Sequence, residues 1–130
     1  MDLAKERSKT EKVIALNSPS QNDVEQILRE IKKSIENLKL YKILVFGSAV
    51  SGKFHKDSDI DLVIILDQKG IAKTYKERIK NRKTVSKLLR DIRKKIPIDL
   101  FVYTKDEWDL LQKSGSTFYK EIEEKGRVIS

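Results

Sequence analysis

Two aspartates at the start of an apolar segment are the side chains in this sequence best placed to do chemistry. Asp59 precedes the segment 60–66 and Asp61 is its second residue. If this segment is a β-strand, alternate side chains share a face, so the two carboxylates point the same way with Cα atoms roughly 6.6 Å apart. Carboxylates that close repel each other unless a cation lies between them. The spacing therefore predicts a site for a divalent cation.

A third carboxylate is expected to join this pair. Asp99 is the second residue of another apolar segment, and the helical stretch between the two segments predicts a crossover between parallel strands. Parallel strands begin at the same end of a sheet, so Asp99 should lie near Asp59 and Asp61. The chain has no cysteine and one histidine, His55, which favours oxygen ligands and hence magnesium or manganese over zinc. We predict one or two Mg²⁺ ions and phosphoryl or nucleotidyl transfer.

A Gly-Ser turn is predicted to reach the same edge of the sheet. Gly47 and Ser48 end the apolar segment 41–46. Glycine lets the backbone approach a phosphate closely, and the serine hydroxyl can donate a hydrogen bond to it. Lys53, which could supply positive charge, and Ser58, which could equally brace the loop, are further candidate nucleotide-binding residues.

Residues 47–53 also match the spacing of a P-loop, G-x-x-x-x-G-K. Phe54 stands where a P-loop has a magnesium-binding serine or threonine. Residues 56–59 lead within a few positions into a strand, whereas a P-loop opens a long helix. We therefore reject the P-loop interpretation.

Hydrophobic periodicity predicts the elements that position these residues. Strands are expected at 41–46, 60–66 and 98–103, and helices at 21–37, 71–95, 104–112 and 118–125. The segment 60–66 is apolar on both faces, which is typical of a central strand. Thr104 and Glu107 form a predicted capping box. The apolar side chains of the helix at 71–95 should face inward: Ile79, Val85, Leu88, Leu89 and Ile92.

These elements predict an α+β fold with an α/β-like character, in which a small mixed sheet has flanking helices. At 130 residues the chain has room for one core. We expect an N-terminal arm over residues 1–20 and a single domain over 21–130. No apolar run approaches the roughly 18 residues of a membrane span, and the start lacks a signal-peptide pattern, which favours the cytoplasm and no membrane partner.

Positive charge is concentrated in one segment. The net charge is +8, and residues 69–95 contain twelve lysines and arginines against Glu77 and Asp91. Such a segment (Lys69–Lys95) could face a nucleic acid or another phosphate-bearing partner. Tyr75 is its one stacking aromatic, so a solvated helix is the interpretation that we favour over nucleic-acid binding.

The motifs together resemble a known family. Gly47-Ser48, Gly52 and the segment 58–62 are similar to the G-S-x-x-x-G…S-D-x-D-L signature of the nucleotidyltransferase superfamily that includes DNA polymerase beta. The size resembles that of its minimal nucleotidyltransferase (MNT) domains. The segment 97–100 looks like the strand that carries the family's third carboxylate. The residues 118–129 look like the end of these domains, so the resemblance covers about residues 24–129.

The resemblance implies a nucleotidyltransferase fold that binds ATP or another nucleoside triphosphate with magnesium. Asp59 and Asp61 would hold the metal ions, and Asp99 would bind one of them and help to deprotonate the acceptor hydroxyl. Gly47 and Ser48 would hold the terminal phosphates. The acceptor oxygen would attack the α-phosphate, NMP (AMP in the case of ATP) would be transferred, and pyrophosphate would leave.

The resemblance also implies a partner. Many small members resemble the antitoxin of a toxin–antitoxin pair, which inactivates a HEPN-domain toxin by transferring AMP to a tyrosine. Where family members often carry arginine, this sequence has Ala49 and Ser51. Two alternatives remain open: a catalytically silent binding module with the same fold, and a nucleic-acid-binding protein that uses the basic segment 69–95.

Overall fold

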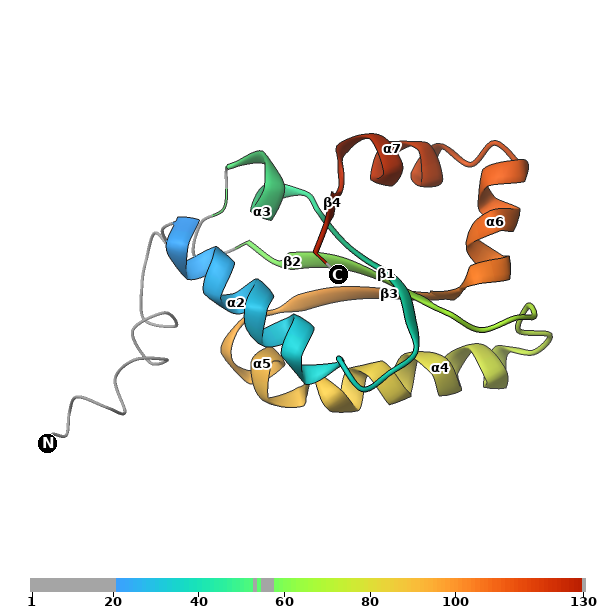
Figure 1. The fold of residues 1–130 in the computed structure, drawn as a ribbon, viewed down its shortest axis with the longest axis horizontal. Coiled ribbons are helices and arrows are strands. Elements are labelled where there is room, and N and C mark those ends of the chain that lie inside the picture. Colours follow the sequence, from blue (N-terminus) through green and yellow to red (C-terminus); the bar gives the residue numbers. More distant parts are fainter. Residues whose placement is uncertain (1–20, 53, 55–57, 130) are drawn as a thin grey trace, which may run out of the picture.

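The computed structural model describes residues 21–52, 54 and 58–129, so the predicted N-terminal arm lies outside the described residues (Figure 1). Its strands are β1 (Leu40–Phe46), β2 (Ile60–Leu66), β3 (Ile98–Thr104) and β4 (Arg127–Val128). They form one sheet in the order β3-β2-β1-β4. β2 runs parallel to β3, as the crossover predicted, and β1 runs antiparallel to both β2 and β4.

Helices cover both faces of this sheet (Figure 1). They are α2 (Gln21–Ser34), α3 (Ser48–Ser51), α4 (Tyr75–Leu88), α5 (Arg90–Lys95), α6 (Lys105–Lys113) and α7 (Thr117–Lys125). α2, α4 and α5 lie on one face, and α6 and α7 on the other. The predicted mixed sheet with flanking helices is therefore confirmed. Among the described residues, no helix is both long enough and apolar enough to cross a membrane.

β2 is the centre of the fold. Its even-numbered side chains from Ile60 to Leu66 belong to the core cluster that contains the apolar stripe of α2 and the buried residues of α4 and α5. Val63 and Ile65 belong to a second cluster, with Trp108 from α6 and Ile122 from α7. This alternation confirms that the strand is apolar on both faces and central.

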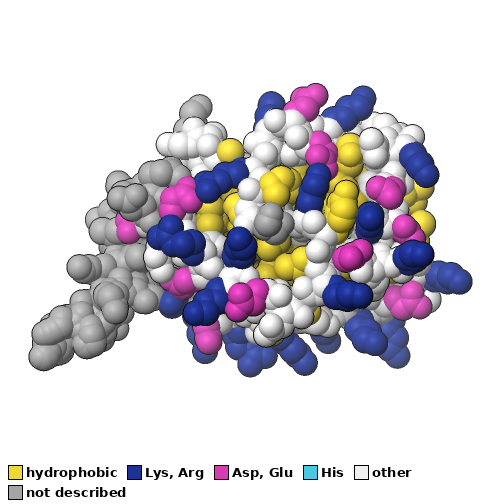
Figure 2. Space-filling view, viewed as in Figure 1, with side chains coloured by type: hydrophobic (Ala, Val, Ile, Leu, Met, Phe, Trp, Pro, Cys, Tyr) yellow, Lys and Arg dark blue, Asp and Glu magenta, His cyan; other side chains and the backbone are white. Residues whose placement is uncertain are grey.

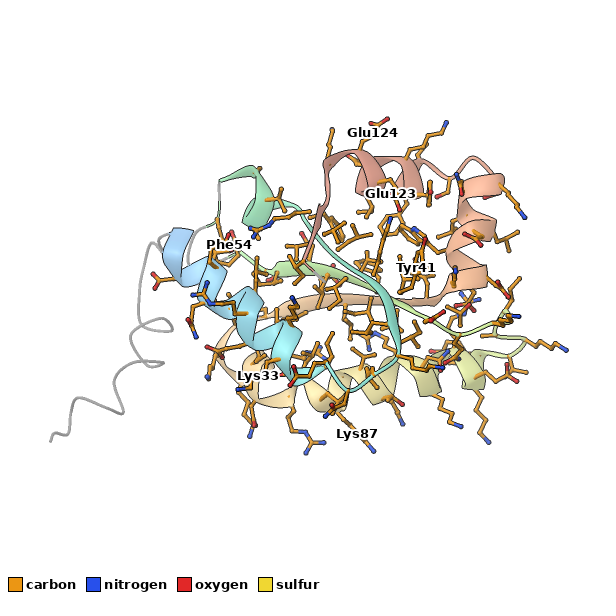
Figure 3. The ribbon with its side chains drawn as sticks, in the orientation of Figure 1. Lys33, Tyr41, Phe54, Lys87, Glu123 and Glu124 are labelled. Atoms are coloured by element: carbon orange, nitrogen blue, oxygen red, sulfur yellow. The ribbon has the colours of Figure 1, made fainter. Side chains whose placement is uncertain are left out.

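The helices on the second face are held to the sheet by a partly buried polar contact. Trp108 is 3% exposed, and its indole Nε1–H donates a hydrogen bond of 2.8 Å to the Glu123 carboxylate. The same carboxylate forms an ion pair of 3.3 Å with Lys42 Nζ on β1. Glu123 points from α7 toward the sheet, whereas Glu124 points away from it (Figure 3). One side chain thus links α6, α7 and β1.

The helix predicted over 71–95 is wrong at its start. α4 begins only at Tyr75, where the Thr74 hydroxyl accepts a hydrogen bond from the Glu77 amide. The loop before α4 is not helical, because its amides bind the start of α6. The Ala72 amide donates a hydrogen bond of 2.8 Å to the Glu107 carboxylate, and the Gly70 amide donates one of 2.6 Å to the Asp106 carboxylate.

The same prediction is wrong again at Leu88. The helix breaks at Leu89, which has φ −96° and ψ 8°, so α4 and α5 are separate. Leu89 is buried, but Leu88 is 44% exposed rather than inward. The capping box of Thr104 and Glu107 at α6 is confirmed.

Two short elements were not predicted. α3 lies within what periodicity indicated as a loop between β1 and β2. β4 extends the sheet beside β1, where Val128 pairs with Leu44 and Arg127 with Val45. Both elements are too short for a periodic pattern, and β4 forms because α7 returns the chain to the edge of β1.

Candidate functional site

The parallel pairing of β2 and β3 places two aspartates side by side. Asp61 pairs in register with Asp99, and the Ile60 amide donates to the Pro97 carbonyl at 3.0 Å where the two strands begin. The neighbouring side chains Ile60 and Leu62 face the opposite side of the sheet. Asp61 therefore lies on the face covered by α6 and α7, at the end of the sheet where both strands begin.

Asp59 lies just before β2, in an exposed position. Burial raises the pKa of Asp61, and the negative charges of Asp99 and then Asp59 raise it further. Both other carboxylates therefore interact electrostatically with Asp61. Burial and the nearby negative charges together disfavour the ionised form of Asp61.

The chemistry of these donors fits a hard divalent cation, because carboxylate oxygens are the ligands that such ions prefer. Across the part of the chain that the structure describes, no group of three or more Asp, Glu, His or Cys side chains is placed so that it could hold a metal ion. Asp61 and Asp99 pair in register and Asp59 lies just before β2, but in this structure the three side chains do not converge into a metal site. In sites of this type, substrate phosphates complete the coordination.

Gly47 lies directly against one of these carboxylates, that of Asp61. Its φ is +77°, and a Cβ built on it would lie 2.2 Å from Asp61 Oδ2. Phe46, the residue before it, pairs with Asp61 in the antiparallel register of β1 and β2. The turn after β1 thus packs its bare backbone against the carboxylate, which only glycine permits at this contact.

Ser48 begins α3 directly after Gly47, and the Ser51 amide donates to the Gly47 carbonyl at 3.1 Å. Ala49, at a position where family members often have arginine, is 3% exposed and belongs to the core under α2. Ser51, the other such position, is exposed. Of the remaining candidates, Ser58 is buried next to Asp59, and Lys53 lies outside the described residues.

Phe54 packs against the core cluster that contains α2, as Figure 3 shows. α3 is one turn long, and β2 begins nine residues after its end. A P-loop would continue into a long helix at this point. The structure therefore agrees with the rejection of the P-loop.

A pocket of about 620 Å³ adjoins Asp61 between α3 and α7. Gly47 and Ser51 line one side of it, and Phe118 and Lys125 from α7 line the other. Sequence reasoning did not assign α7 to the site. The sequence predicts a helix over 118–125, but nothing in it indicates which end of the sheet that helix covers.

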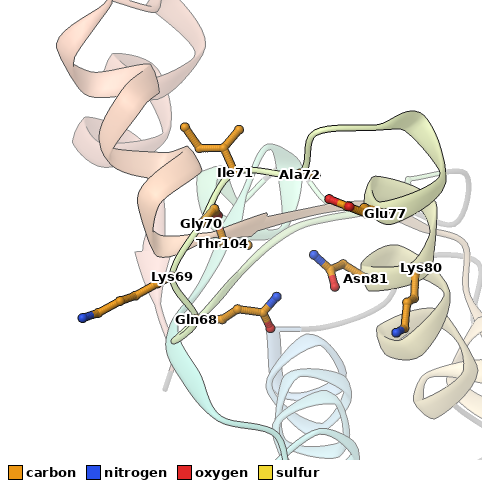
Figure 4. A pocket seen from close by; sticks show the side chains of 9 residues that line it. All are labelled: Gln68, Lys69, Gly70, Ile71, Ala72, Glu77, Lys80, Asn81 and Thr104. Atoms are coloured by element: carbon orange, nitrogen blue, oxygen red, sulfur yellow. The ribbon is translucent and has the colours of Figure 1, made fainter.

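A different pocket lies at the opposite end of the sheet (Figure 4). Thr104, the last residue of β3, contributes to it, and the side chains of Gln68 and Asn81 point toward one another across it (Figure 4). Five residues of strand separate Thr104 from Asp99, or roughly 17 Å at the usual rise. This pocket is therefore not part of the carboxylate site.

Comparison with known proteins points to one family. A family model described as nucleotidyltransferase domain matches residues 24–129. No curated protein matches the chain. A solved structure from Sulfolobus solfataricus, assigned as a nucleotidyltransferase, is similar with a TM-score of 0.52 and 20% identity, over 81% of this chain and 80% of that one.

A toxin–antitoxin structure with AMP-PNP aligns with a TM-score of 0.47 and 21% identity, over 78% of this chain and 70% of that one. Another structure assigned as a nucleotidyltransferase aligns with a TM-score of 0.40 and 24% identity, over 82% and 96% of the two chains. The Sulfolobus likeness, at its low identity, shows a shared fold.

Proposed function

The chain belongs to the nucleotidyltransferase domain family, and from this membership we propose that it transfers AMP from ATP to a hydroxyl group of a partner protein. Nucleotidyl transfer is the activity of the family, whose members use a nucleoside triphosphate and a divalent metal. Mg²⁺, ATP and a protein acceptor are the specific choices proposed here. The domain would comprise residues 21–130 and act in the cytoplasm.

The observation that supports this proposal best is that Asp61 lies beside Asp99 and against Gly47. The register of β2 and β3 places the first two side by side, and the turn after β1 packs against Asp61. Asp59, Asp61 and Asp99 would hold one or two Mg²⁺ ions. When bound, the ions would neutralise phosphate charge and favour displacement at phosphorus.

The chain's own residues would bind and orient the reactants. Gly47 and Ser48 would contact the terminal phosphates through backbone amides and the serine hydroxyl, with Lys53 adding positive charge and Ser58 bracing the loop. The pocket between α3 and α7 adjoins Asp61 and has room for the rest of the nucleotide. The missing arginines at 49 and 51 would leave the phosphates held mainly by metal and backbone.

The transfer balances as a displacement at the α-phosphorus. The acceptor oxygen forms a new bond to this atom, the bond to the bridging oxygen toward the β-phosphate breaks, and pyrophosphate leaves. Asp99 would accept the proton of the acceptor hydroxyl. We propose a tyrosine of a HEPN-domain toxin as the acceptor, which would make this chain the antitoxin; the support is the resemblance of residues 24–129 to MNT domains.

The test uses the purified chain, Mg²⁺, and the protein encoded by the neighbouring reading frame. ATP labelled on the α-phosphate should transfer its label to that protein, whereas ATP labelled on the γ-phosphate should not. Asp59→Asn, Asp61→Asn and Asp99→Asn should each lower the rate by at least about 100-fold, as loss of an essential charge at a reacting centre does.

Asp67→Asn is the matched control, because Asp67 is an exposed acid just past the other end of β2. It should keep the wild-type rate. Absence of label with all four nucleotides, together with no metal-dependent ATP binding, would favour the silent binding module. Transfer to RNA rather than to protein would favour the nucleic-acid alternative.

A further inference from the structure

A groove of about 600 Å³ runs between β3 and α4 and reaches Asp99. Its floor includes Leu100 and Val102 of β3, and Glu107 lies at its far end. β3 is at the edge of the sheet, so within the described part of the chain one side of its backbone has no neighbouring strand. The groove therefore leads along an open strand edge to the third carboxylate.

The wall formed by α4 is basic. Arg78, Arg82 and Lys83 line the groove, and all three residues are exposed. Arg82 Nε donates to the Leu100 carbonyl at 3.4 Å, which places its guanidinium over the edge of β3. Within the described residues, neither Arg78 nor Lys83 takes part in an ion pair. α4 lies along the lower margin of the molecule in Figure 1, and this margin is rich in Lys and Arg in Figure 2.

The two acids that line the groove, Glu107 and Asp99, offset only part of the charge of its three basic side chains. Glu107 is buried, and its carboxylate accepts the amides of Thr104 and Ala72 at 2.9 and 2.8 Å. Asp99 belongs to the carboxylate site. The groove therefore keeps a net positive charge, which is complementary to an acidic ligand.

The shape of the groove favours a polypeptide over a nucleic acid. Single-stranded nucleic acids bind by stacking bases on open aromatic faces. Phe101 packs on Phe118 at 5.4 Å between ring centroids, and Tyr103 packs on Trp108 at the same distance. Tyr75, at 78% exposure, is the one open aromatic face among the groove residues. An extended peptide needs instead an open strand edge and shallow apolar pockets.

We propose that this groove binds an acidic, extended segment of the acceptor protein and presents its hydroxyl-bearing residue to Asp99. The proposal rests on the proposed function and adds the chemistry of the partner. ATP would enter from the pocket between α3 and α7, beside β1, whereas the acceptor would enter along β3. Because β2 lies between these two strands, the reactants approach the carboxylates from opposite sides.

A random copolymer of glutamate and tyrosine is the probe, since it offers tyrosine hydroxyls in acidic extended chains. Its binding is measured by titration calorimetry without ATP. We expect Arg78→Glu with Lys83→Glu to weaken binding by about tenfold or more, since two attractive charges become repulsive. A lysine–tyrosine copolymer should not bind to the wild-type protein.

The matched control is Lys76→Glu with Lys87→Glu, which makes the same change of charge on the same helix. Neither side chain lines the groove, and Lys87 points away from the sheet (Figure 3). The control should bind the glutamate–tyrosine copolymer within about twofold of wild type. Circular dichroism and thermal melting of both double variants should match those of the wild type.

Equal weakening by both double variants would overturn the proposal, because it would mean diffuse charge attraction. Tighter binding of an oligoadenylate RNA that displaces the copolymer would overturn it in favour of a nucleic acid. Since the binding assay contains no nucleotide, intact copolymer binding without AMP transfer would refute the proposed function alone. If the variant Arg78→Glu with Lys83→Glu transfers AMP to the copolymer with the wild-type KM for the copolymer, only the proposed binding of the acceptor in the groove is refuted.

Discussion

At the scale of single residues, the site depends on how closely Gly47 approaches Asp61. The glycine has a left-handed φ of +77°, and the space that a Cβ would need is taken by the carboxylate. Glycine is therefore required here for two separate reasons: the backbone has a left-handed conformation, and there is no space for a Cβ atom. Gly52 has only the first of them, with φ +84° and nothing within 4 Å of its Cβ position.

This difference makes a matched pair of variants. Gly47→Ala and Gly52→Ala should each cost about 1–3 kcal/mol of folding stability through backbone strain. Gly47→Ala should in addition displace Asp61 and lower AMP transfer by at least about tenfold, whereas Gly52→Ala should retain the wild-type rate once folded. Urea unfolding and rate measurements on both proteins check this. Similar rates for the two variants would mean that the Gly47 contact is not part of the site.

The raised pKa of Asp61 makes stability depend on pH. Burial, Asp99 and Asp59 all favour its protonated form in the folded protein. Between the ordinary carboxyl pKa and the raised value, the folded state binds more protons than the unfolded one, so stability falls as pH rises through this window. With metal removed by EDTA, Asp61→Asn should raise Tm at pH 7 and lose this advantage below about pH 4.

Asp67→Asn serves as the control for this comparison, since Asp67 is exposed at the other end of β2. Its Tm should follow that of the wild type across the pH range. Addition of Mg²⁺ at pH 7 should stabilise the wild type and not Asp61→Asn. A wild-type Tm that does not respond to Mg²⁺ would contradict the assignment of these carboxylates as metal ligands.

At the scale of elements, α7 has two roles, because it forms a wall of the pocket next to Asp61 and fastens the second face of the sheet. Glu123 joins it to Trp108 on α6 and to Lys42 on β1. A buried indole N–H that loses its acceptor retains the cost of desolvation. The position of the pocket wall therefore depends on this carboxylate as well as on the apolar contacts of Phe118 and Ile122.

Glu123→Ala should lower the free energy of unfolding by about 1–3 kcal/mol, since it leaves the Trp108 N–H without its acceptor. Glu124→Ala, one residue later and facing away from the sheet, should change it by less than about 0.5 kcal/mol. Denaturant titration followed by tryptophan fluorescence measures both. Equal effects would mean that the network contributes little to the attachment of α7.

At the scale of the whole molecule, the site draws on β1, β2, β3 and α3, so ligand binding should oppose global unfolding. ATP with Mg²⁺ at 100 times its Kd should stabilise the protein by about 2.7 kcal/mol. Thermal melting measures this shift. ATP without the divalent ion should stabilise much less, and a shift independent of metal would contradict the proposed mode of phosphate binding.

Much of this architecture is encoded locally and could be predicted from the sequence. The strand 60–66 was predicted with its observed bounds, because apolar side chains on both faces are a property of the segment itself. The capping box of Thr104 and Glu107 is likewise a contact between near neighbours. Asp99 was placed near Asp61 because a helical crossover constrains two strands to run parallel.

The tertiary structure alone decided the features that join segments distant in the chain. The pairing of β4 with β1, the wall that α7 forms beside Asp61, and the groove of Arg78 and Lys83 leading to Asp99 all depend on how helices settle on the sheet. Side-chain periodicity shows which face of a helix is buried, but it does not show which other element that face packs against. Amino-acid order therefore determined which carboxylates are the candidate reacting groups, whereas packing determined the surfaces that lead to them.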